Sequence, residues 1–180
     1  MSGNLRRLPS YYFDASVYLA YLRNEEPIYG KQRIKAIETV WQQSERAGTV
    51  IVTSTISLTE VLAHKLSSSA EKKFLQAFDS GIHQLEDVTP PIAMRARQYR
   101  DYYKKNPVKC PGGDAKRSDL RTPDAIHLAT AAIIRCDQFW TFDGVAGSKD
   151  TIGILWLGNK VAEDSLVLSQ PELLQGEFPI

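Results

Sequence analysis

The sequence contains 180 residues, which suits one ordinary domain and is short for two. Hydrophobic residues make up 43% of it and charged residues 24%, values typical of soluble globular proteins, so disordered and fibrous classes are excluded. No apolar run reaches the roughly 18 residues of a membrane span, and residues 1–10 lack the apolar stretch of a secretory signal. Because the two cysteines form no disulfide framework, we expect a cytoplasmic protein without membrane contact.

Basic residues are concentrated in one part of the chain. The net charge is only +1, but residues 95–121 contain nine basic and three acidic residues. Residues 161–180, in contrast, contain four acidic residues and no Lys or Arg. Such a charge distribution permits a polyanionic partner without identifying one.

Hydrophobic periodicity and chain-breaking residues predict strands that alternate with helices. In chain order, we expect a strand over 8–13, helices over 16–23 and 31–46, a strand over 49–53, helices over 56–66 and 70–79, a strand over 82–88, helices over 89–105 and 122–136, and strands over 138–142 and 152–157. Strands separated by helices pair in parallel through right-handed crossovers. The expected fold class is therefore α/β, a three-layer α/β/α domain with a central parallel sheet flanked by helices.

Two of these segments are expected in the interior. Residues 49–53 are β-branched throughout, as in a strand covered on both faces. Residues 125–134 include no charged side chain, so their helix is expected to be buried. Residues 107–113, rich in Pro and Gly, are expected to form a loop, and no structure is predicted after residue 158.

Four acidic residues fall near the carboxyl edge of the predicted sheet, where sites gather in open parallel sheets. They are Asp14, Glu60, Asp124 and Asp143. Taken singly, Asp14 and Asp124 are explained as residues at helix N-termini, and Asp143 as part of a turn. Glu60 is explained by plain solvent exposure. Four such residues at one edge nevertheless favour a common site.

A pocket that contained all four carboxylates would need a cation, because converging carboxylates repel and desolvate one another until some bind protons. Oxygen ligands without a nearby cysteine or paired histidines favour Mg²⁺ or Mn²⁺ over Zn²⁺. Such an ion accepts phosphate oxygens as further ligands, lowers the pKa of an attacking water and neutralises charge on a leaving oxygen. The four acids therefore indicate phosphoryl chemistry assisted by a divalent cation.

Four segments resemble, in order and spacing, the motifs of the PIN-domain ribonucleases, and above all those of the VapC-type toxins of prokaryotic toxin–antitoxin modules. These segments are residues 14–17, 54–60, 124–131 and 141–143. The resemblance covers residues 8–158, which we interpret as a PIN-like nuclease domain, and we interpret residues 159–180 as an acidic C-terminal extension rather than a separate domain. It implies a metal-dependent endoribonuclease that uses a metal-activated water and leaves a 5′-phosphate and a 3′-hydroxyl.

The resemblance also implies roles for individual residues and for partners. The catalytic residues and ligands of Mg²⁺ (or Mn²⁺) carry over as Asp14, Glu60, Asp124 and Asp143. Ser54 and Thr141 match hydroxyl residues that accompany the acids in the family. RNA is the implied substrate, and a homodimer and a small antitoxin protein are the implied protein partners.

The sequence departs from the compact toxins by a basic insertion over residues 104–121. Its candidates for contact with the RNA backbone are Lys109, Lys116, Arg117 and Arg121. Phosphate contacts of this kind provide affinity and salt dependence but little sequence preference. The ordinary interpretation, a solvated basic surface, stays open for this insertion.

The histidines provide no metal site of their own, because no two of them have helical ligand spacing. We interpret His127 as a satisfied core residue or one that supports the site. His64, four residues after Glu60, is a weaker candidate for the same cleft. A haloacid dehalogenase is disfavoured, because Ser16 stands where that class needs a second Asp. The main alternative function is a non-catalytic PIN-like module that binds RNA or protein.

Overall fold

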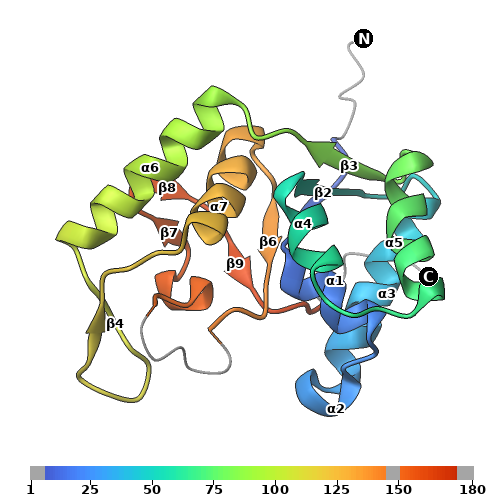
Figure 1. Cartoon of the computed structure of the whole chain (residues 1–180), viewed down its shortest axis with the longest axis horizontal. Coiled ribbons are helices and arrows are strands. Elements are labelled where there is room, and N and C mark those ends of the chain that lie inside the picture. The colour runs from blue at the N-terminus through green and yellow to red at the C-terminus, as the bar shows by residue number, and fades with distance from the viewer. Residues whose placement is uncertain (1–6, 145–150, 174–180) are drawn as a thin grey trace, which may run out of the picture.

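A parallel sheet of five strands forms the centre of the protein (Figure 1). The structure is a computed structural model and describes residues 7–144 and 151–173. The strands lie in the order β3-β2-β1-β6-β9, and every neighbouring pair is parallel. Their bounds are Ser10–Phe13 for β1, Val50–Ser54 for β2, His83–Glu86 for β3, Gln138–Trp140 for β6 and Leu168–Ser169 for β9.

Helices cover both faces of this sheet, which confirms the predicted three-layer α/β/α class. One face carries α1 (Ala15–Leu22), α3 (Lys31–Glu45) and α5 (Ser68–Asp79), and the other carries α6 (Pro90–Lys105) and α7 (Thr122–Ile134). Two shorter helices, α2 (Glu26–Tyr29) and α4 (Ile56–Leu62), belong to the crossovers. Among the described residues, no helix has both the length and the apolar character needed to cross a membrane.

The central strand β1 contributes to the hydrophobic layers on both faces. Because side chains alternate along a strand, Tyr11 and Phe13 join the layer that contains Trp41. Tyr12 joins the opposite layer, which contains Leu128 of α7. Burial of a ring such as that of Phe13 stabilises the fold by about 1.5–3 kcal/mol. The buried Tyr12 hydroxyl also needs a polar partner, and its partner lies at the site described below.

Residues 152–157 do not form the predicted strand. They contain a 3₁₀ helix, η1 (Ile154–Leu157), and the strand that pairs with β6 on its outer side is β9. The backbone N–H groups of Ile154 and Leu155 donate to Asp143 rather than to a neighbouring strand. A short apolar run fits a strand or a buried helical turn equally well, so hydrophobic pattern alone could not distinguish them.

The structure also contains two short hairpins that the sequence pattern does not predict. One lies in the basic insertion and pairs β4 (Val108–Lys109) with β5 (Lys116–Arg117). The other follows η1 and pairs β7 (Lys160–Val161) with β8 (Asp164–Ser165). Each of these strands has two residues, which is too short for an alternating hydrophobic pattern to be visible.

Candidate active site

The sheet brings the four predicted acidic residues to one edge. Strands β1, β2 and β6 are parallel and in register, so the chain leaves all of them at the same side. Asp14 and Asp143 follow β1 and β6, Glu60 lies on α4 after β2, and Asp124 lies in the first turn of α7. One pocket of about 340 Å³ is lined by all four, together with Ser16, Tyr29, His64, Arg121, His127 and other residues.

Asp14 is the most deeply placed carboxylate and is held only by neutral donors. Its side chain caps α1, since Oδ1 accepts hydrogen bonds from the Val17 N–H at 3.1 Å and the Ser16 hydroxyl at 2.6 Å. Its other oxygen accepts from the Thr141 hydroxyl at 2.5 Å. Burial raises the pKa of Asp14, and the His127 ring and these hydrogen bonds oppose the rise. Asp14 is therefore a carboxylate short of positive charge.

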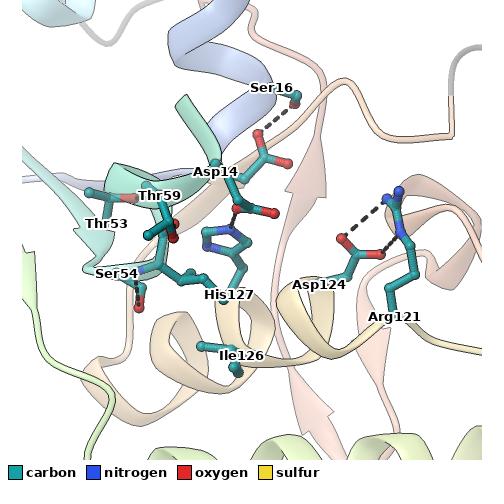
Figure 2. Close-up of polar contacts among 12 residues, drawn as sticks. Asp14, Ser16, Thr53, Ser54, Thr59, Arg121, Asp124, Ile126 and His127 are labelled. Atoms are coloured by element: carbon teal, nitrogen blue, oxygen red, sulfur yellow. Dashed lines mark hydrogen bonds and ion pairs between the residues drawn. The ribbon is translucent and has the colours of Figure 1, made fainter. Parts of the chain in front are cut away.

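Arg121 connects two other acids of the pocket, Asp124 and Asp143, and Figure 2 shows its contact with the first. Its guanidinium donates to both oxygens of Asp124, at 2.7 and 3.2 Å, and reaches Asp143 at 3.3 Å. Burial raises the pKa of Asp124 to about 7, while the Arg121 hydrogen bond opposes the rise and the Asp143 charge adds to it. One guanidinium thus faces two carboxyl groups.

Asp143 is fixed by the chain on both sides of it. Its Oδ2 accepts a hydrogen bond from the Ile154 N–H at 2.9 Å, and its own N–H donates to Thr141 at 2.9 Å. Gly153 leaves room for this contact, because a Cβ at that position would lie 2.5 Å from the Gly144 Cα. Thr141 thus bonds to both Asp14 and Asp143 and ties two acids of the pocket together.

Glu60 is held by a histidine that the sequence analysis did not place among the catalytic residues. His127 Nε2 lies 2.7 Å from Glu60 Oε2, and Tyr12 Oη lies 2.8 Å from Nδ1 of the same ring. The spacing of Asp124 and His127, three residues apart in α7, puts both on one face of the helix and was the available sequence signal. Figure 2 shows His127 between two other groups, the pair of Asp14 and Ser16 and the pair of Asp124 and Arg121.

The remaining predicted residues lie around this pocket or away from it. Ser54 is fully buried at the end of β2, where its hydroxyl lies 3.5 Å from the Ile56 N–H, and it does not line the pocket. Lys109 and Lys116 are exposed on the β4–β5 hairpin, and Arg117 is half-buried there. Of the four basic candidates, only Arg121 reaches the acids, with which it forms ion pairs.

The donor set suits a hard divalent cation, although the side chains do not surround one as they are placed. Within the two described ranges, no three acidic, imidazole or thiol groups converge closely enough to hold a metal ion. In this arrangement, Asp124 and Asp143 turn towards Arg121, and Glu60 turns towards His127. The pocket nevertheless offers oxygen donors of the kind that Mg²⁺ and Mn²⁺ prefer, and buried Asp14 lacks a charged hydrogen-bond partner.

Comparison with known proteins shows to which family the chain belongs. The sequence model of the family described as PIN domain matches residues 11–148, or 138 of the 180 residues, so the chain belongs to the PIN domain family. No curated protein sequence matches it significantly.

Two solved structures are similar to this chain at low sequence identity. A toxin–antitoxin complex from Klebsiella pneumoniae is 21% identical, with a TM-score of 0.49 over 90% of this chain and 98% of that one. The sarcin–ricin loop cleaving toxin VapC20 from Mycobacterium tuberculosis is 18% identical, with a TM-score of 0.48 over 74% of this chain and 90% of that one.

Proposed function

We propose that this PIN-domain protein is a Mg²⁺- or Mn²⁺-dependent endoribonuclease of the VapC-like toxin type. The observation that carries the proposal is the pocket itself, in which four acids from four separate parts of the chain come together. Two of them, Asp14 and Asp124, are almost fully buried, and this burial raises the pKa of both carboxyl groups. Such an arrangement is costly for folding alone and is typical of functional sites.

In this proposal the acidic side chains bind the cation and the basic ones bind the RNA backbone. The metal ligands would be Asp14, Glu60, Asp124 and Asp143. When bound, the ion would lower the pKa of an attacking water and neutralise charge on the phosphate. Thr141 keeps Asp14 and Asp143 at a fixed separation through its two hydrogen bonds. Arg121, the last residue of the basic insertion, forms ion pairs with two of the acids and would be the basic residue that contacts a phosphate at the pocket.

The proposal predicts that purified protein cleaves single-stranded RNA only with a divalent cation. EDTA should abolish cleavage, and an excess of Mn²⁺ should restore it, because the carboxylates then regain their counter-charge. Cleavage is followed on an RNA labelled at its 5′ end, and product ends are identified by their reaction with a phosphatase and a ligase. RNA that is bound but never cut, with Mn²⁺ present, would instead favour the non-catalytic binding module.

The protein partners of this proposal are a second copy of the chain and a small antitoxin. They rest on membership of the PIN family and on the resemblance of the motifs to those of VapC-type toxins. The neighbouring gene is the direct test of the antitoxin. A short reading frame whose product has a DNA-binding N-terminus and abolishes RNA cleavage when added would support it, whereas a product without effect on cleavage would contradict it.

A second prediction is that the β4–β5 hairpin of the basic insertion contacts RNA phosphates. Replacing Lys116 and Arg117 by Ala should make RNA binding less dependent on salt, because each lost phosphate contact lowers the slope of log affinity against log salt by about 0.7 for single strands. Binding is measured with EDTA present over a series of salt concentrations. The matched control replaces Arg46 and Lys72, two exposed residues of other elements. An unchanged slope in the hairpin variant would mean that the hairpin does not contact RNA phosphates.

A further inference from the structure

The described part of the chain contains two buried tyrosine–histidine pairs, one on each face of the sheet. Tyr12 Oη lies 2.8 Å from His127 Nδ1, and Tyr18 Oη lies 3.2 Å from His83 Nδ1. Both histidines are 2% exposed. The pairs differ at the other ring nitrogen. His127 Nε2 lies 2.7 Å from the Glu60 carboxylate, whereas His83 Nε2 is buried without a hydrogen-bond partner.

The contacts of His127 select one arrangement of its hydrogens. An ionised carboxylate can only accept, so Nε2 carries the hydrogen that is donated to Glu60. In the neutral ring, Nδ1 is then an acceptor and takes the hydrogen of the Tyr12 hydroxyl. Tyr12 therefore favours the tautomer that can donate to Glu60.

Glu60 has the most exposed side chain of the four acids. Its side chain, on α4, is 31% exposed, and a partly exposed glutamate retains several rotamers unless a partner holds it. The His127 side chain is 3% exposed, and its ring packs edge to face on Tyr12 with centroids 5.8 Å apart. A buried side chain thus holds a partly exposed one at the rim of the pocket.

We propose that His127 is a positioning residue of this site, which Tyr12 orients and whose Nε2–H fixes the Glu60 carboxylate at the pocket. The inference rests on the proposed function, in which Glu60 is a metal ligand. Loss of a group that holds a ligand in this way typically lowers metal affinity or activity by about 10- to 100-fold. The second pair, whose histidine contacts no acid, provides a control of the same chemistry within the same chain.

The test compares substitutions at the two histidines. His127→Phe keeps a ring but removes both nitrogens, whereas His127→Gln keeps an N–H that can donate to Glu60. Mn²⁺ affinity, measured by electron paramagnetic resonance of the free ion, should fall by about 10- to 100-fold in His127→Phe and recover most of this loss in His127→Gln. His83→Phe and His83→Gln should keep the affinity of the unmodified protein. Near-ultraviolet circular dichroism verifies that each variant is folded.

Two results would overturn the proposal. One is unchanged Mn²⁺ affinity in His127→Phe. The other is a His127→Gln variant as weak as His127→Phe, which would show that the imidazole does more than donate one hydrogen bond. If His127→Phe fails to fold, the comparison of His127→Gln with Glu60→Gln replaces it, and a loss of affinity in His127→Gln equal to that in Glu60→Gln would count against positioning.

Nitrogen-15 NMR of the imidazole separates a failure of this inference from a failure of the proposed function, because it needs neither metal nor RNA. The unmodified protein should show His127 as a single tautomer protonated at Nε2, and Tyr12→Phe should produce a mixture. A ring protonated at Nδ1 alone would refute the positioning role, and no response to Tyr12→Phe would refute the part of the proposal in which Tyr12 orients the ring. If the NMR result holds but the unmodified protein neither binds Mn²⁺ nor cuts RNA, only the proposed function fails.

Discussion

Replacing Asp14 by Asn should abolish RNA cleavage and leave the protein folded. The substitution removes the charge of a proposed metal ligand from the pocket. Since even the partners of a ligand are worth about 10- to 100-fold in activity, a loss above 100-fold is expected. Asn keeps an oxygen that can accept from the Val17 N–H and cap α1. Because burial raises the pKa of Asp14, the charge is unfavourable in the metal-free fold, and thermal stability should be preserved or increased.

Asp124→Asn should behave in the same way, since Asp124 is also buried and has a raised pKa. Asp101→Asn, on the exposed surface of α6, removes the same charge away from the pocket and should leave cleavage unchanged. Cleavage rates with saturating Mn²⁺ and melting temperatures are measured for all three variants. Near-normal cleavage by either pocket variant would contradict the roles assigned to the acids.

Acidification should destabilise the fold through His83, which does not line the pocket of the acids and is buried beside Tyr18. Its ring packs against Trp41 at a centroid distance of 4.3 Å, and Nε2 has no hydrogen-bond partner. Burial lowers the pKa of His83 from 6.5 to about 3, so the unfolded chain binds a proton between these pH values and the folded chain does not. The free energy of unfolding therefore falls as pH drops below 6.5, by roughly 2–3 kcal/mol between pH 6 and pH 4.

Urea unfolding of the unmodified protein and of His83→Phe, at several pH values, measures this contribution as a difference. The difference is needed because Asp14 and Asp124, with raised pKa values, bind protons more readily in the folded state and so act in the opposite direction. The variant should lose less stability on acidification than the unmodified protein. Parallel loss in the two proteins would show that His83 does not titrate in this window.

The layered fold and the meeting of the acids could be anticipated from local sequence. Strand and helix patterns fix the crossovers, and a parallel sheet brings the residues that follow β1 and β6 to one edge. This pattern was sufficient to predict that Asp14 and Asp143 lie at the same edge of the sheet. Glu60 was harder to place, because a residue at the polar edge of a short helix is compatible with solvent exposure, and only the fold shows that it faces His127.

Other features depend on contacts that no short segment encodes. The apolar run over residues 152–157 contains η1, in which the N–H group of Ile154 donates a hydrogen bond to Asp143. The edge strand of the sheet is formed by Leu168–Ser169 instead. The charge of Arg121 made it a candidate for contact with the RNA backbone, and only the fold shows that its guanidinium also forms ion pairs with two acids. Asp143 lies outside the short segment in both cases, although Asp124 is a near neighbour of Arg121 in the sequence, so periodicity and composition contain no signal for the contacts with Asp143.

The all-parallel order of the sheet also has a practical consequence. All strands of the five-stranded sheet end at the edge where the pocket lies, so the segments that lead from the helices back into the strands lie at the opposite edge. One of these segments, between α5 and β3, contains Gly81. Gly81 has a φ of +72° and no neighbouring atom within 4 Å of where a Cβ would lie. A fluorophore or an immobilisation handle inserted beside it would be separated from the acids by the length of a strand, so tethered protein would present its pocket freely to solution.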